Sequence, residues 1–175
     1  GYKLAYVYQY DFMGGYPILY AYHSTESPYP SYQAYLEDRG ECLQGDGLGL
    51  NCNYLAHVQS DGSELGYLQL LLLDVMGNQF YLFWHAEYND TTFVATEKAL
   101  EDIIENISDP FIPLSRQQRS QARRINLTPT VSIGEETVEI RAVWFTKWGG
   151  FYESTYSIYR KDPHLISIGS VSYTH

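Results

Sequence analysis

The sequence lacks a hydrophobic run long enough to cross a bilayer as a helix. Such a span needs about 20 apolar residues, and the most apolar segment, Leu68–Leu73, is far shorter. The first residues are rich in tyrosine and interrupted by polar residues, which is not the pattern of a secretory signal peptide. We therefore expect no membrane partner, and both a cytoplasmic and a secreted location stay open.

Basic residues are also scarce. The chain has 11 Lys and Arg against 21 Asp and Glu, a formal net charge of −10. Nucleic acids and anionic membranes bind electropositive surfaces, so this composition argues against both as partners. One segment is an exception, because Ser115–Ile125 contains four arginines: Arg116, Arg119, Arg123 and Arg124.

Only two cysteines occur, Cys42 and Cys52. The glycine-rich segment between them can close a disulfide, and two free thiols in a reducing compartment fit the spacing equally well. A tetrahedral zinc site needs two further ligands, which no neighbouring residue supplies. We expect no bound metal and no cofactor.

Common catalytic motifs are absent as well. The sequence contains no nucleophile elbow, phosphate-binding loop, dinucleotide fingerprint or zinc-protease helix motif. Its 175 residues, 45% hydrophobic and 18% charged, are typical of one globular domain spanning residues 1–175. The motifs therefore predict no reaction.

The most apolar part of the chain predicts a central hairpin. Leu65–Val75 has the length of a strand, Gly77-Asn78 is typical of a two-residue turn, and Asn78–Glu87 predicts the returning strand. This register places Leu73 opposite Leu82, with an almost wholly apolar face turned towards the core.

Two helices are predicted after a third strand at Thr91–Ala95. Thr96 is a suitable N-cap for the first, whose apolar residues recur at helical spacing. The second is the arginine-rich segment at about Ser115–Arg124. An acidic helix followed by a basic one predicts an antiparallel pair.

Period-two patterning predicts a strand at Lys3–Phe12. Turn and breaker signals delimit further predicted strands, which are Pro17–His23, Cys52–Gln59, Thr130–Ile133, Thr137–Lys147, Phe151–Arg160 and His164–Tyr173. A short helix is expected at Ser31–Asp38. A turn centred on Gly149-Gly150 would place Glu139 opposite Arg160.

The expected fold class is α+β. It consists of a mainly antiparallel, strongly twisted sheet of seven to ten strands, either barrel-like or split into two layers. One helical pair is inserted between the central meander and the C-terminal hairpins. The predicted core is a single cluster formed by Leu71, Leu73, Val75, Leu82, Trp84, Leu100, Ile103, Ile104 and Ile107.

One candidate for catalysis is the group His85, Glu87 and Asp90. Strand spacing places His85 and Glu87 on one face, with Asp90 at the following turn. A carboxylate beside an imidazole orients the ring and raises its pKa, as a general base requires. The alternative is a strand-end histidine that is merely hydrogen-bonded at the rim of a sheet.

Aromatic residues form the other candidate site. Tyrosine has an apolar face and a polar tip, which suits sugar rings and protein interfaces. The candidate ligand-binding residues are Tyr6, Tyr8, Tyr10, Tyr81, Trp144 and Trp148. The preferred function is a non-catalytic binding or interaction module for a small ligand or a protein partner. A hydrolase-like or metal-assisted enzyme using His85 is the alternative, and a structural protein that assembles through sheet edges is the third possibility.

Overall fold

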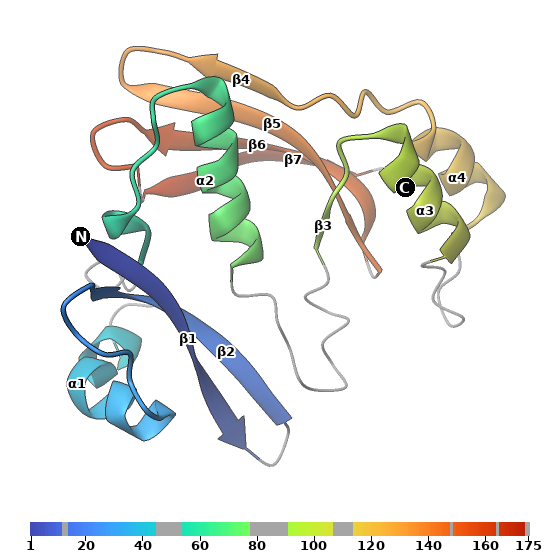
Figure 1. Ribbon diagram of the computed structural model, residues 1–175. Coiled ribbons are helices and arrows are strands. Elements are labelled where there is room, and N and C mark those ends of the chain that lie inside the picture. The colour runs from blue at the N-terminus through green and yellow to red at the C-terminus, as the bar shows by residue number, and fades with distance from the viewer. Residues whose placement is uncertain are drawn as a thin grey trace.

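The computed structural model describes residues 1–11, 14–44, 54–77, 91–106, 114–147, 149–163 and 165–173. Within these residues the fold is α+β, as predicted, with two antiparallel sheets, neither of which closes into a barrel (Figure 1). The elements are β1 (Tyr2–Asp11), β2 (Gly14–His23), α1 (Tyr32–Gln44), the 3-10 helix η2 (Tyr54–His57), α2 (Glu64–Met76), β3 (Thr92–Phe93), α3 (Glu97–Asn106), α4 (Arg116–Ala122), β4 (Thr130–Ile133), β5 (Thr137–Thr146), β6 (Gly150–Tyr159) and β7 (Ile166–Tyr173).

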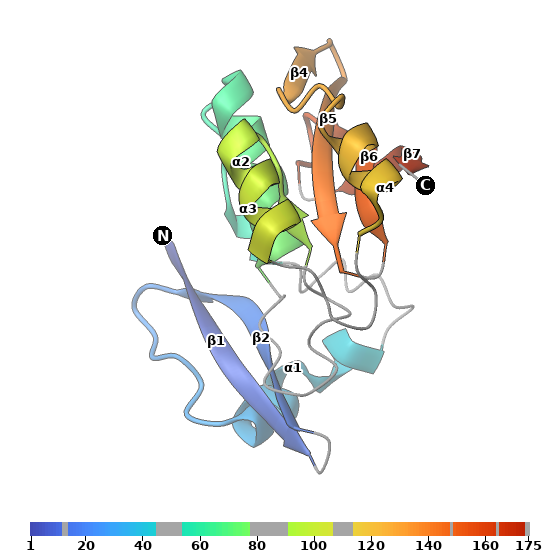
Figure 2. The ribbon, with the colours of Figure 1, turned by 90° about the vertical axis from the view of Figure 1, so that its right-hand side faces the viewer.

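The two sheets differ in size and position. β1 and β2 form a two-stranded sheet, whereas β3, β5, β6 and β7 follow one another in a five-stranded sheet in which β4 also pairs with β5. Figures 1 and 2 both show the β1–β2 hairpin and α1 below the larger sheet. α2 connects the two parts, because its residues share one buried cluster with Leu19 and Ala21 of β2 and with β5 and β6.

The predicted strand at residues 65–75 is wrong, because this segment is the helix α2. Ser63 is the N-cap, and its hydroxyl accepts a hydrogen bond from the Gly66 N–H (3.0 Å). Leucine, glutamine and methionine favour helices, and β-branched residues are absent until Val75. Tyr67, Leu70 and Leu71 form the buried helical stripe. The predicted partner strand and its turn lie outside the described residues from Asn78 onward.

Two other local predictions need correction. Part of the strand predicted at residues 52–59 is the 3-10 helix η2. The β5–β6 strands exist, but the predicted register is wrong: Glu139 lies opposite Ser157, and Thr146 pairs with Gly150. The connection is therefore longer than the two residues expected, and Gly150 adopts a φ of +69° that favours glycine. Arg160 instead donates to the carbonyls of Gly134 and Glu135.

The predicted single core is in fact divided between two clusters. Leu71 packs with alternate residues of β5 that include Ile140 and Trp144. A separate cluster contains Leu100, Ile103 and Ile104 of α3. They pack there with Val143, Phe145 and Phe151 of the sheet. Because successive strand residues point to opposite faces, β5 can serve both clusters. Leu73 and Val75 are only partly buried, and Leu82, Trp84 and Ile107 lie outside the described residues.

The helices α3 and α4 begin where the sequence predicted. The Thr96 hydroxyl accepts from the Ala99 N–H (3.1 Å), and Ser115 with Gln118 forms a capping box. An ion pair joins the two helical segments, since Arg123, the C-cap of α4, donates to both carboxylate oxygens of Glu101 (2.8 and 2.7 Å).

Candidate functional site

The β1–β2 hairpin presents two different faces because its side chains alternate. On one face, Val7 and Tyr20 pack against Tyr35 of α1 in a small buried cluster. On the other face, Leu19 contributes to the main core beside α2. Tyr6 lies on this second face as the cross-strand partner of Leu19. The period-two pattern that predicted the strand therefore also separates its tyrosines into two groups.

Tyrosine rings and hydroxyls tie α1 to the hairpin. The Tyr20 ring lies 5.1 Å from Tyr29 and 5.5 Å from Tyr35, measured between ring centroids. The Tyr20 hydroxyl accepts from the Tyr29 N–H (2.8 Å). The Tyr29 hydroxyl donates to the Asp38 carboxylate and accepts from Arg39 Nε. Burial is the main cause that raises the pKa of Tyr20, Tyr29 and Tyr35, so these hydroxyls are neutral at physiological pH.

On the opposite face, tyrosine hydroxyls contact the C-terminal end of α2. Tyr6 donates to the Gly77 carbonyl (2.7 Å), and Tyr54 donates to the Leu73 carbonyl (3.0 Å). The Tyr6 bond satisfies a carbonyl at the helix end, where carbonyls lack helical partners. The Leu73 carbonyl also accepts from the Gly77 N–H (2.9 Å), so Tyr54 is its second donor. Gly77 allows the close approach, since a Cβ there would lie 2.8 Å from the Tyr54 hydroxyl and 2.9 Å from Leu19 Cδ2. Gly77 is thus a helix-terminal packing residue.

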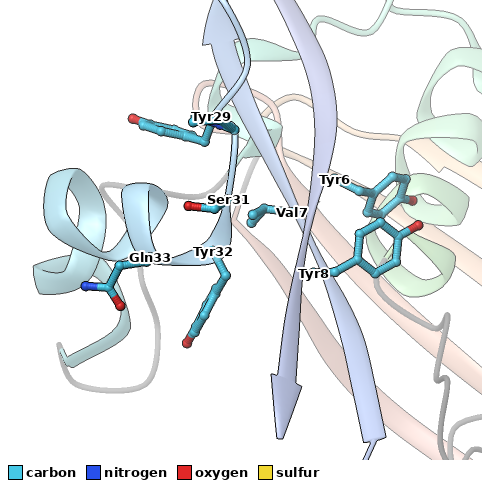
Figure 3. Close-up of a pocket in the computed structure, with 8 residues that line it drawn as sticks. Tyr6, Val7, Tyr8, Tyr29, Ser31, Tyr32 and Gln33 are labelled. Atoms are coloured by element: carbon cyan, nitrogen blue, oxygen red, sulfur yellow. The ribbon is translucent and has the colours of Figure 1, made fainter.

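A hollow of about 490 Å³ lies beside β1 (Figure 3). Its lining combines three consecutive β1 residues with the segment that leads into α1, and the lining residues are Tyr6, Val7, Tyr8, Tyr29, Pro30, Ser31, Tyr32 and Gln33. Figure 3 shows Tyr6 and Tyr8 projecting to one side of β1 and Val7 to the other, where Tyr29, Ser31 and Tyr32 lie.

The position of this hollow follows from strand geometry. Consecutive side chains of a strand point to opposite faces, so one hollow that contacts residues 6, 7 and 8 must border an edge of the strand. β2 pairs along one edge of β1, and the hollow therefore follows the other edge. We call this hollow the tyrosine groove.

The structure brings only part of the predicted aromatic site together. Tyr6 and Tyr8 both line the tyrosine groove. Trp144 of β5 is completely buried in the cluster that packs against α2, and its ring contacts Phe93 and Tyr156. It therefore does not reach the groove. The side chain of Tyr10 is not described, and Tyr81 and Trp148 lie outside the described residues.

His85, Glu87 and Asp90, the predicted catalytic group, also lie outside the described residues. Their roles therefore stay predictions. Within the described part of the chain, no group of three or more His, Cys, Asp or Glu residues is placed to hold a metal ion. The side chain of Cys42 is not described, and Cys52 lies outside the described residues.

Sequence reasoning missed the second wall of the groove. The segment 29–33 reaches into the short helix predicted at Ser31–Asp38, and no binding role is predicted for it. Its signal was the recurrence of tyrosine at positions 29, 32 and 35, together with Pro30. Only the fold shows that this segment lies beside Val7, because the end of β1 and all of β2 separate the two in the sequence.

A smaller hollow of about 250 Å³ borders the first half of α2. It is lined by Val58, Gln59, Ser60, Asp61, Gly66, Gln69, Leu70 and Leu73. Asp61 is already engaged there, because its carboxylate accepts from both the backbone N–H and the hydroxyl of Ser63 (2.9 and 2.6 Å). These bonds lower the pKa of Asp61 and secure the start of α2.

Comparison with known proteins adds no relative: no protein-family model, curated protein or solved structure matches the chain. Among the described helices, none has both the length and the apolar character required to cross a membrane.

Proposed function

We propose that the protein is a non-catalytic binding or interaction module, with the tyrosine groove as its binding site. The observation that carries this proposal is the convergence of four tyrosines from two separate segments on one hollow of about 490 Å³. Binding sites for small molecules have volumes of roughly 300–1,000 Å³ and are lined mainly by apolar and aromatic groups with a few polar ones. The groove has this size and this mixture.

The chemistry of the lining favours an uncharged ligand. Among the described residues that line the groove, none carries a formal charge, and polar groups come from Ser31, Gln33 and the tyrosine hydroxyls. The pKa of Tyr6 is raised, mainly by burial and to a smaller extent by the neighbouring Tyr8. The Tyr6 hydroxyl is therefore neutral at physiological pH. Tyrosine rings offer flat apolar contact area, and their hydroxyls offer hydrogen bonds. Such a surface suits a neutral saccharide or an uncharged peptide segment.

The exposed fractions of the lining tyrosines leave contact area for a ligand. Tyr8 is 42% exposed and Tyr6 38% exposed, although Tyr6 also supports α2 through its bond to Gly77. A ligand would therefore gain its ring contacts mainly from Tyr8 and from Tyr32, which is partly buried against the cluster around Tyr20.

Backbone NMR with defined probes tests the proposal. We titrate the chain with neutral disaccharides and, separately, with a short uncharged proline-rich peptide. One of the two probe classes is expected to shift the amide resonances of residues 6–8, 29 and 31–33. The same probe is expected to bind Tyr8→Ala and Tyr32→Ala at least about tenfold more weakly, since a lost aromatic contact is worth roughly 1.4 kcal/mol or more.

Tyr159→Ala is the matched control, because Tyr159 is 49% exposed on β6 and does not line the groove. Its affinity should equal that of the unsubstituted chain. Resonance shifts that avoid both groove segments, or an equal loss of affinity in Tyr159→Ala, would contradict the proposal.

A further inference from the structure

The last strand of the large sheet has an unusually bare edge. In the described part of the chain, β7 pairs with β6 along one side and with no strand along the other. Residues 165–173 contain neither a charged residue nor a proline. Ile168, the third residue of β7, is 62% exposed, more than any other large apolar strand residue whose side chain the structure describes. Exposed edges of this kind are templates for pairing with another strand.

The ladder shows which backbone groups of β7 point outward. The Tyr159 N–H donates to the Leu165 carbonyl (3.4 Å), and Ile158 is the partner of Ile166. Hydrogen-bonded and non-hydrogen-bonded pairs alternate along an antiparallel ladder. Ser167 therefore directs its backbone groups towards β6, whereas Ile166 and Ile168 direct theirs away from the sheet.

Two other described edges, those of β2 and β5, carry features that hinder pairing. Pro17 removes an N–H donor from β2. The outer side of β5 is covered by β3 and β4, which are themselves only two and four residues long. Short strands and proline are two of the ways in which proteins prevent edge-to-edge association. β7 has eight residues and neither protection.

We propose that β7 is a self-association edge, at which two copies of the chain pair β7 with β7 in antiparallel orientation and extend the sheet across a two-fold axis. An isologous contact places the same surface of both copies together. Each copy carries a net charge of −10, so most contacts between copies are opposed by repulsion. The β7 edge carries no charge, so two copies can pair there without direct charge repulsion. The exposed Ile168 of each copy would then be buried against an equally apolar surface of the other.

The size of this contact makes it weak. A strand of eight residues spans only about 27 Å, and the register shift between Thr155 and Tyr156 interrupts its ladder. Interfaces at the small end of the size range belong to weak or transient complexes. We therefore expect a reversible dimer that forms with rising protein concentration. Salt should favour it, because salt screens the repulsion between two acidic copies.

Sedimentation velocity over a concentration series tests the dimer, and amide hydrogen exchange locates it. The chain is expected to shift from monomer to dimer as its concentration rises, and the shift should begin at lower concentration in high salt. The Ile166 and Ile168 amides should become protected with dimer formation. The Ser167 amide, which already faces β6, should change much less.

The test variant is Ile168→Lys, which places a charge on the exposed edge and is expected to abolish the concentration-dependent shift. Ile133→Lys is the matched control, because Ile133 is 41% exposed on the short strand β4; it should dimerise as the unsubstituted chain does. Far-UV circular dichroism checks that both variants fold.

Three outcomes would overturn the proposal. The chain could remain monomeric at every soluble concentration, or Ile168→Lys could dimerise as strongly as Ile133→Lys. Alternatively, the Ile166 and Ile168 amides could become protected only when a strand from a different protein is added, which would assign the edge to a foreign partner.

Discussion

Two hairpins of equal strand length, β1–β2 and β5–β6, are stabilised in different ways. β5 and β6 contribute a set of fully buried apolar residues, among them Val138, Ile140 and Ile158. The cluster beside β1–β2 on the α1 side has three buried residues, Val7, Tyr20 and Tyr35, of which two are tyrosines. The C-terminal hairpin relies on buried apolar side chains, both aliphatic and aromatic, such as Trp144 and Phe151. The N-terminal one adds hydrogen bonds from tyrosine hydroxyls.

This difference shows how one chain can combine a stable sheet with a surface suited to binding. Aliphatic side chains stabilise a fold only when they are removed from water. Tyrosines can pack by their rings while their hydroxyls bond to backbone or remain at the surface. A tyrosine-rich hairpin can therefore be ordered while keeping rings such as that of Tyr8 partly exposed.

Truncation of the aliphatic core should have the largest effect. Leu71 is completely buried between α2 and the sheet, so Leu71→Ala should lower the free energy of unfolding by about 2–5 kcal/mol. Leu73→Ala should cost clearly less, because Leu73 is only partly buried. Urea denaturation of both variants measures the difference. Equal losses would mean that the two leucines are buried alike, contrary to the helical stripe of α2.

Removal of one hydroxyl should have a moderate effect in the N-terminal part. Tyr20→Phe leaves the Tyr29 N–H without its acceptor, and an unsatisfied donor costs about 1–3 kcal/mol. Tyr159→Phe, at an exposed position of β6, should leave the stability of the chain nearly unchanged. Urea denaturation again provides the measurement. If Tyr20→Phe is also neutral, ring packing alone holds the hairpin against α1.

A smaller, pH-dependent effect is expected where the two parts meet. Burial raises the pKa of Asp74 above 3.8, and the charge of Asp74 adds to the burial that raises the pKa of Tyr156 to about 12. The folded chain thus favours protonated Asp74. Protonation of Asp74 therefore stabilises the fold. This stabilisation is complete below pH 3.8, the pKa of an ordinary aspartate, and is lost as the pH rises through the raised pKa of Asp74.

Asp74→Asn removes this penalty on the carboxylate. At neutral pH the variant should melt at a higher temperature than the unsubstituted chain. This difference in melting temperature should shrink as the pH falls below the raised pKa of Asp74. Thermal melts of both proteins over a pH series measure it, and other carboxylates cancel in the comparison. A difference that does not vary with pH would place its origin in the shape of the side chain rather than its charge.

Local sequence determined the elements whose signals lie within a few neighbouring residues. Thr96 predicted the start of α3, because an N-cap is an interaction between a side chain and the next turn of backbone. The arginine-rich segment predicted α4 from about Ser115, and the structure shows that Ser115 is its N-cap. Alternation predicted β1, since successive side chains of a strand point to opposite faces. Turn and breaker residues between short segments predicted β2 and β4 to β7. Alternation also placed Tyr6 and Tyr8 on a common face.

Tertiary structure decided what local patterns left ambiguous. The apolar run at residues 65–75 is long enough for either a strand or a helix, and its helical form buries Tyr67, Leu70 and Leu71 against a sheet made from distant residues. The register of β5 and β6 depended on a turn whose length the two glycines did not reveal. The tyrosine groove is likewise a product of folding, because its two walls come from segments that only the return of β2 and the start of α1 bring together.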